Sequence, residues 1–324
     1  MLRALARRLL TAGLTLILVT VVVFLLIHLA PGDPLGGEAE DEGRPVTPEA
    51  REALRAHYRL DQPLHRQYLF WVGDLLQGDL GRSFHDRRPV AEKIRERLGI
   101  TMTLNALALA LMVLLSVPIG MLAALKRDTA WDRLPAIGTY LLYAVPVFWA
   151  GLLAQILFSV RLDWLPLAGL RSTGHDLMGP WTALLDTARH LVLPVACLSY
   201  GGLAYLSRFV RATLIDNAVA ESWRAARARG LAPLQVLWRH GFRQAGVPML
   251  TLAGFLLPAL VGGSVIVESV FAIPGLGRLF VEAAFQRDVP LLMGLTLLSG
   301  TATLAGILAA DLAYAFVDPR IRHG

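Results

Sequence analysis

The chain has 324 residues, of which 55% are hydrophobic and only 17% are charged, and its mean hydropathy is +0.53. A soluble domain of this length is much less apolar, so the composition excludes an ordinary water-soluble enzyme and places the chain in a bilayer. The single cysteine, Cys197, rules out an internal disulfide.

Six uncharged apolar runs are candidates for membrane helices, because a hydrocarbon core about 30 Å thick needs roughly 20 helical residues. The runs are Leu9 to Ala30, Leu98 to Leu125, Leu134 to Val160, Leu191 to Ser207, Ala245 to Val267 and Val289 to Ala310. The fourth run is the shortest, and we expect Arg208 and Arg211 to snorkel and extend it. The first run is too long for a signal-peptide core and no A-x-A site precedes Pro31, so we interpret it as a retained span.

The basic residues of the short loops predict the orientation of these spans. With a cytoplasmic N-terminus, the inside segments carry 15 Lys and Arg residues, whereas the outside loops 161–190 and 268–288 carry three and two. The long loop 32–97 carries 11 basic and 13 acidic residues, and its length removes it from the rule. Both termini are therefore predicted to be cytoplasmic. The net charge of +6 is explained by topology, and no nucleic-acid partner is predicted.

The segment 31–97 is predicted to be an external subdomain, too short for an independent core. Pro48 at the first helical position and Glu49 in the first turn, after Thr47 as N-cap, predict a helix in "TPEAREALRAHY". The stretch "LHRQYLFWVGDLLQG" is amphipathic, with Tyr68 and Trp71 on one face. It suits a helix on the membrane surface, or one that packs on the protein's own spans.

Four of the six runs carry an internal proline, which favours a bundle with a water-accessible pathway because the freed carbonyls need partners. These prolines are Pro118, Pro146, Pro194 and Pro258. Small residues such as Gly201 and Gly202 would let helices approach closely, as in ordinary membrane packing. The candidates for a pathway or gate are Gly262, Gly263, Ser264 and Glu268.

Several kinds of chemistry have no motif in this sequence. It contains no H-E-x-x-H or G-x-S-x-G, and its two lysines, Lys93 and Lys126, do not follow a glycine as in a Walker A loop. We therefore predict no catalytic residue, no metal site, no cofactor and no ATP binding by the chain itself. A self-contained ion-coupled carrier or channel is the alternative, but its candidate groups, His28, Glu268 and Asp311, stand at the ends of spans.

The cytoplasmic segment from Ile215 to Gly246 is predicted to form two short helices that break at Gly230. Gly230 fits the C′ position after "AVAESWRAARAR", with Arg229 in the last turn. The following "APLQVLWRHGFRQAG" places Leu234, Leu237, Trp238 and Phe242 at helical spacing beside arginines. An apolar ridge with a basic flank is typical of a helix that docks into a partner's groove.

At this point the sequence resembles the inner-membrane permease subunits of ABC importers, in particular the oligopeptide and dipeptide permease B subunits of the peptide and nickel group. The stretch "RAARARGLAPLQVLWRHGFRQAGVPML" is similar to that family's EAA region, with Ala225 and Ala226 as its paired alanines and Gly230 as its glycine. Arg224 stands where the general motif has Glu. "FLLIHLAPGDPL", "RLDQPLHRQYLFWVGDLLQGDLGRSF", "ESVFAIPGLGRLFVEAAFQRDVPLLMG" and "DPRIRHG" also resemble the family, in the same order.

The resemblance implies an all-α permease with six transmembrane helices in a bacterial or archaeal cytoplasmic membrane. Its regions would be 1–30, the external loop 31–97, and a five-span core 98–324 that includes the coupling segment 213–246. The expected partners are a second similar permease, two ATP-binding cassette ATPases, an extracytoplasmic substrate-binding protein and membrane lipid. ATP would be hydrolysed by the partners, and the cargo would be a peptide, a nickel complex or a glutathione-like compound. The implied ATPase-coupling residues are Ala225, Ala226, Arg229, Gly230, Leu234, Leu237, Trp238 and Arg239.

Overall fold

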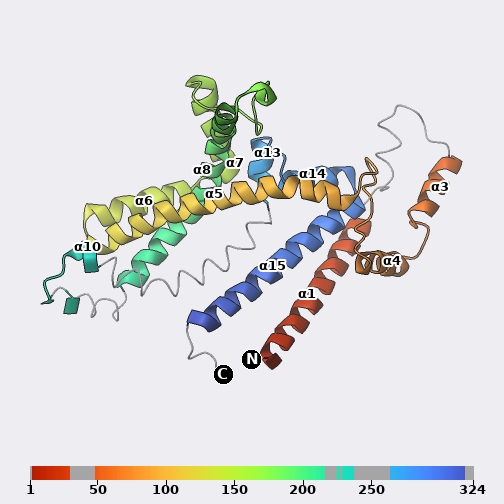
Figure 1. Ribbon diagram of the computed structural model, residues 1–324, viewed down its shortest axis with the longest axis horizontal. Coiled ribbons are helices and arrows are strands. Elements are labelled where there is room, and N and C mark those ends of the chain that lie inside the picture. The colour runs from red at the N-terminus through yellow and green to blue at the C-terminus, as the bar shows by residue number, and fades with distance from the viewer. Residues whose placement is uncertain (1, 30–47, 216–224, 227, 237–262, 318–324) are drawn as a thin grey trace.

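The computed structural model describes residues 2–29, 48–215, 225–226, 228–236 and 263–317 (Figure 1). Within these ranges the chain is helical, without a strand, as the all-α prediction requires. The helices are α1 (Leu2–Leu29), α3 (Pro48–His57), α4 (Leu64–Leu76), α5 (Val90–Leu125), α6 (Ala130–Ala144), α7 (Val147–Ala154), the π-helix η1 (Gln155–Arg161), the 3-10 helix η2 (His175–Leu177), α8 (Pro180–Ile215), α10 (Pro233–Val236), α13 (Val265–Val270), α14 (Leu276–Gln286) and α15 (Val289–Val317).

Four described helices, α1, α5, α8 and α15, are long and apolar enough to cross a membrane. They correspond to the first, second, fourth and sixth predicted spans. The third is the bent pair formed by α6 with α7 and η1, which turns by 97° at Pro146 and makes a fifth crossing if it counts as one span. Most of the fifth predicted span, Ala245 to Val267, lies outside the described residues. The count of six therefore stays a prediction.

The helices α5 and α8 pack along each other and form the centre of the described bundle. The two helices meet closely at two glycines: a Cβ on Gly120 would lie 2.5 Å from the backbone carbonyl oxygen of Ser207, and a Cβ on Gly202 would collide with the sulfur of the Met112 side chain. Gly201, in contrast, has open space around it. The proposed close approach is thus made by Gly202 and not by its neighbour.

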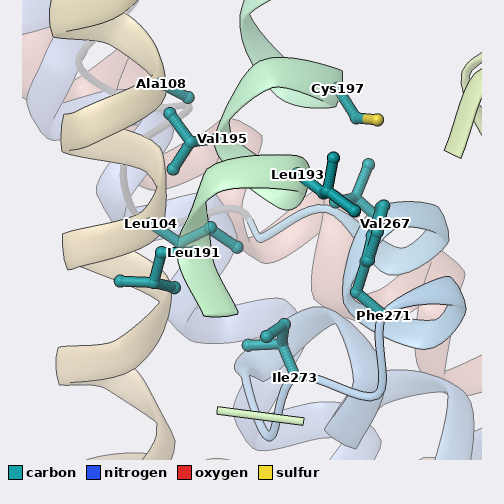
Figure 2. Packing of buried hydrophobic residues seen from close by; sticks show 9 residues of the cluster. All are labelled: Leu104, Ala108, Leu191, Leu193, Val195, Cys197, Val267, Phe271 and Ile273. Carbon is teal, nitrogen blue, oxygen red and sulfur yellow. The ribbon is translucent and has the colours of Figure 1, made fainter. Parts of the chain in front are cut away.

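The largest apolar core lies where α5, α8 and the α13–α14 hairpin meet (Figure 2). Figure 2 shows Leu104 and Ala108 of α5 facing side chains of α8, with Phe271 and Ile273 of the hairpin on the other side. The whole cluster is Leu104, Ala108, Leu191, Leu193, Val195, Cys197, Val267, Phe271 and Ile273. This core joins the hairpin that carries the gate candidates to the central helix pair.

The helix α8 has 36 residues and contains the whole fourth apolar run, Leu191 to Ser207, together with Arg208 and Arg211, which we expected to extend it. We ended the apolar run at its charged neighbours, but the helix continues through them because they have partners. At its N-terminal end the carboxylate of Asp186 accepts hydrogen bonds from Ser172 N and Oγ and lies 2.8 Å from His175 Nδ1. At its C-terminal end Arg211 is paired with Asp132.

The helices α3 and α4 lie at the end of α1 away from its N-terminus, in the segment 31–97 that was predicted to be an external subdomain (Figure 1). The helix α3 begins at Pro48 as predicted. Of the two roles left open for α4, its aromatic face packs on the chain's own first span: Tyr68 OH lies 2.9 Å from Thr20 Oγ1, and its ring meets Phe24 edge-on at 5.4 Å. The opposite face leaves Leu69 and Leu76 exposed. An amphipathic helix of this kind can pack on protein and rest on lipid at once.

A buried polar cluster fastens the end of this subdomain to α5 and α15. Asp288, fully buried just before α15, accepts hydrogen bonds from Ser83 Oγ and from the backbone N–H of Phe84. Lys93 of α5 donates to Ser83 and to Asp86. Burial alone would raise the pKa of Asp86, but its interactions with Lys93 and Ser83 outweigh that effect and hold the pKa below its ordinary value.

We predict that Gly120→Ala destabilises the chain by about 1–3 kcal/mol, because the new methyl group meets backbone at the α5–α8 contact. The change should lower the thermal unfolding temperature of the full chain purified in detergent. Gly201→Ala is the matched control, since nothing lies within 4 Å of its new methyl group. Equal unfolding temperatures for the two variants would contradict the close contact.

Candidate functional site

In the described part of the segment 213–246, a helix ends at Gly230 as predicted. Gly230 has φ +82°, a left-handed conformation that favours glycine, and Leu231 N–H donates to the carbonyl of Ala226 at 3.4 Å. This six-to-one bond, with a left-handed glycine at C′, is the Schellman arrangement. Ala226 is fully buried, whereas Arg229 is exposed and its Nε donates to the carbonyl of Ala225. The segment therefore makes a sharp, fixed turn.

The short helix α10 starts directly after this turn. Ala232 N–H donates to the side-chain oxygen of Gln235 at 3.3 Å, and Pro233 takes the first helical position, both of which favour a helix start here. Val236 is fully buried. Leu234 lies within α10, while Leu237, Trp238 and Arg239 lie outside the described residues. The apolar ridge proposed from the sequence is therefore described only at its beginning.

A partly buried ion pair fixes the end of α8, with the carboxylate of Asp132 buried and Arg211 about one third exposed. Arg211 of α8 makes a two-pronged contact with Asp132 of α6, with Nε–Oδ1 at 2.6 Å and a terminal nitrogen–Oδ2 distance of 2.7 Å. Asp132 also accepts a hydrogen bond from Asp128 N–H. One turn earlier, the guanidinium of Arg208 stacks on the ring of Tyr140 at 4.1 Å. These arginines therefore contact α6.

Sequence reasoning missed this pair. No role was predicted for Asp132, and Arg211 was interpreted only as a snorkelling residue. The available signal was that Asp132 is an acid in the first turn of a helix, where the helix dipole favours a negative charge. The partner lies 79 positions away in the sequence, and no local pattern connects the two.

The gate candidates meet in the α13–α14 hairpin, around a buried carboxylate. Glu268, which the sequence placed at the end of a span, has 0% exposure. Its Oε1 accepts from Thr101 Oγ1 at 3.1 Å and from Ser264 N–H at 3.4 Å, and its Oε2 accepts from Arg278 N–H at 2.9 Å. The backbone donors belong to the starts of α13 and α14, where the helix dipole favours an anion.

Glycines let the hairpin close around Glu268. Gly263 has φ +65°, and a Cβ there would lie 2.8 Å from the backbone nitrogen of Gly277. A Cβ on Gly275 would lie 2.5 Å from the Glu268 carboxylate. Ser264 caps α13, with its Oγ accepting from Val267 N–H. Gly262 lies outside the described residues. The structure therefore brings together three of the four gate candidates, Gly263, Ser264 and Glu268.

Two further contacts, both absent from the predicted set, tie this hairpin to its surroundings. Thr101 of α5 accepts a hydrogen bond from Leu276 N–H at 2.8 Å while its own hydroxyl donates to Glu268. Gln155, at the start of η1, donates to the carbonyls of Leu167 and Val270. A π-helical turn inside a helix often marks a functional position, but the sequence carries no local signal for it.

The bend between α6 and α7 is held from α8. Val145 is the C-cap residue of α6, and the next residue, Pro146, has no backbone N–H. Tyr200 OH donates to the carbonyl of Val145 at 2.8 Å, which satisfies an acceptor that a continuous helix would have used. Both the bend and the ion pair therefore fix the α6 segment relative to α8.

Comparison with known proteins gives two family matches. Residues 116–323 match the family described as "Binding-protein-dependent transport system inner membrane component", and residues 1–105 match the N-terminal region described for such membrane components. An oligopeptide transport system permease protein of Bacillus subtilis (strain 168) is 36% identical over 306 residues, 94% of each chain. A protein named as a peptide transport system permease in Brucella abortus (strain 2308) is 38% identical over 308 residues, 95% of each chain.

We predict that Arg211→Gln destabilises the chain by about 1–3 kcal/mol, because it leaves the buried carboxylate of Asp132 without its partly exposed cation. The unfolding temperature of the purified full chain in detergent measures the effect. Arg127→Gln is the matched control, since its pair with Asp128 is exposed and contributes at most about 1 kcal/mol. Combining Arg211→Gln with Asp132→Asn should recover part of the loss. A double variant no more stable than Arg211→Gln would contradict this account.

Proposed function

Because the chain belongs to the family of binding-protein-dependent transport system inner membrane components, we propose that it is the permease subunit of an ATP-driven peptide importer. The observation that carries this proposal is the extent of the likeness. The two family matches cover residues 1–105 and 116–323, and the relatives align over at least 94% of the chain. Peptides are proposed as cargo because those relatives are named for peptide or oligopeptide transport.

The proposal includes the partners that such a permease needs. A second, similar permease would complete the translocation pathway, two ATP-binding cassette ATPases would supply the energy, and an extracytoplasmic binding protein would deliver the peptide. In this arrangement both termini and the coupling segment 213–246 face the cytoplasm, and the subdomain within 31–97 faces outward. The positions of the described helices support this orientation. The first residues of α1 and the last residues of α15 lie at one side of the molecule, and α3 and α4 lie at the other side (Figure 1).

The helix α8 supplies a mechanical connection between the ATPase side and the gate hairpin. With 36 residues it is about 54 Å long at 1.5 Å per residue, enough to cross the bilayer without a break. Its Arg211 end is tied to α6 next to the coupling segment, and its Leu193 packs in the core that holds Phe271 of the hairpin. A shift of the coupling segment would therefore move both ends of α8 together.

Glu268 is the proposed gate residue within this scheme. Its carboxylate holds the starts of α13 and α14 together, and Thr101 connects both to α5. If α5 moved relative to the hairpin, the carboxylate of Glu268 would need new hydrogen-bond donors in place of those it lost. Burying a carboxylate without hydrogen-bond donors costs free energy. The cluster therefore favours two discrete hairpin positions.

We predict that the combined change Leu234→Glu, Leu237→Glu and Trp238→Glu uncouples transport. Negative charges on an apolar docking ridge would prevent its burial against the ATPase. Peptide uptake by proteoliposomes that contain all subunits should fall at least tenfold, a loss of about 1.4 kcal/mol or more in coupling. Leu234→Met, Leu237→Met and Trp238→Phe together form the matched control, which keeps the ridge apolar.

Uptake at the normal rate by the charged variant, at normal subunit levels, would show that the ridge does not dock the ATPase. Nucleotide-free uptake by the chain alone would instead support the ion-coupled carrier. The two results are separated by running each variant with and without ATP.

We predict that Glu268→Gln impairs gating, because an amide has one acceptor oxygen where the carboxylate serves three donors with two. Uptake should fall about tenfold or more, in line with a buried donor left unpaired. Glu282→Gln is the matched control, since Glu282 pairs with Arg278 on the partly exposed face of α14. A Glu268→Gln complex that transports like the Glu282→Gln complex would refute the gate role.

A further inference from the structure

The second half of the bent third span packs against the gate hairpin. The helix α7 lies on α13, so closely that a Cβ on Gly151 would come within 3.3 Å of the side chains of Val270 and Phe271. The first half, α6, has its polar anchor elsewhere, in the pair between Asp132 and Arg211 of α8. The bend therefore separates a half that is anchored on α8 from a half that contacts the hairpin.

The end of α13 takes hydrogen-bond donors from this second half and from the segment that follows it. The last carbonyl groups of a helix have no donor within the helix itself. The carbonyl of Val270, the last residue of α13, accepts a hydrogen bond from Gln155 Nε2 at 3.1 Å. The carbonyl of Phe271 accepts one from the backbone N–H of Gly169 at 2.8 Å. Gln155 begins η1, and Gly169 belongs to residues 162–170, which we call the strap.

The side-chain amide of Gln155 also holds the strap. The residue is 7% exposed, and its Nε2 donates to the carbonyl of Leu167 at 2.7 Å as well as to that of Val270. Both partners are acceptors, so the amide has to present its NH2 group, whose two hydrogens match the two carbonyls. Buried carbonyl groups need such donors within a membrane protein, because lipid supplies none. One side chain therefore joins η1, the strap and α13.

The strap is in turn fastened to η1 by its own hydrogen bonds. Ser159 Oγ donates to the carbonyl of Pro166 at 3.0 Å, and the backbone N–H of Trp164 donates to the carbonyl of Phe158 at 2.9 Å. Phe158 and Leu165 also pack against the apolar core of Figure 2. The strap and η1 therefore form one body, and Gln155 connects this body to the hairpin.

We propose that Gln155 is a positioning residue for the gate, which acts through the carbonyls of Leu167 and Val270. It joins α7, η1, the strap and the hairpin into one unit, and this unit turns relative to α6 about the bend at Pro146. The inference rests on the proposed function, in which Glu268 is the gate residue.

Gln155 reaches the gate through the helix that carries the gate carboxylate. Glu268 and Val270 belong to the same short helix, so holding the end of α13 also places the carboxylate for its hydrogen bond with Thr101 of α5. Without the donors of Gln155, α13 would shift relative to the strap, and the hydrogen bonds of Glu268 would form in fewer molecules. Gating would slow as a result.

The first test measures backbone hydrogen exchange by mass spectrometry in the assembled complex, in mild detergent and without ATP or peptide. Gln155→Met keeps a side chain of similar length but has no N–H donor. Amides of the strap and of residues 271–275 should exchange about tenfold faster than in the unaltered complex, because two hydrogen bonds are lost. Gln77→Met is the matched control, since Gln77 is exposed and donates to the carbonyl of Gly73 in α4.

The second test is the pH profile of peptide uptake by the Gln155→Glu complex in proteoliposomes. A carboxyl group donates one hydrogen bond when it is protonated and none when it is ionised. Uptake by Gln155→Glu, divided by uptake by the matched control Gln77→Glu, should therefore fall about fivefold between about pH 5 and about pH 9, the range in which buried glutamates ionise. A side chain that only fills space would give a constant ratio.

Equal exchange by Gln155→Met and the unaltered complex would overturn the proposal, and so would faster exchange in the strap alone. A ratio of uptake rates that does not change with pH would overturn it too, because Gln155 would then be a packing residue. The exchange measurement needs no transport. It decides the role of Gln155 even if the complex takes up no peptide, which is the result that would refute the proposed function.

Discussion

The close contact between α5 and α8 is the constraint on which the position of the α13–α14 hairpin and the end of α8 at Arg211 both depend. Gly120 brings the two helix backbones together, Gly202 makes room for the side chain of Met112, and no larger residue fits at Gly120 without displacing backbone. From this pair, Thr101 of α5 reaches the gate hairpin, and Arg211 of α8 reaches the segment next to the coupling turn. In a bilayer the hydrophobic effect does not drive helices together, so such shape matching has to supply the association.

Three buried carboxylates complete what helix packing begins. Asp288 joins the external subdomain to α15, Glu268 joins α13, α14 and α5, and Asp132 joins α6 to α8. All three lie at or near the start of a helix, where backbone N–H groups and the dipole stabilise a negative charge. A membrane interior tolerates a carboxylate only with such donors. Each acid therefore fixes a junction between segments that are distant in sequence.

Local patterns in the sequence predicted the local structure well. The start of α3 at Pro48 and the left-handed turn at Gly230 follow from capping preferences that act over a few residues. The part of α8 before Leu191 and the pair between Asp132 and Arg211 were missed, because hydropathy treats a charge as the end of a span whether or not it has a partner. The contacts around Glu268 were likewise missed, since their partners lie up to 167 positions apart. Tertiary pairing decides such features, and one sequence does not display it.

The arrangement of fixed and bent helices constrains how the protein can move. The helix α8 is continuous from Pro180 to Ile215 although Pro194 lies inside it. The α6–α7 segment is instead broken at Pro146, and Tyr200 of α8 holds the break through the carbonyl of Val145. A tilt of α8 would therefore change the angle of the broken segment and the position of the hairpin at the same time. A change in the tilt of α8 would thus reach both the bend at Pro146 and the α13–α14 hairpin, because α8 contacts each of them.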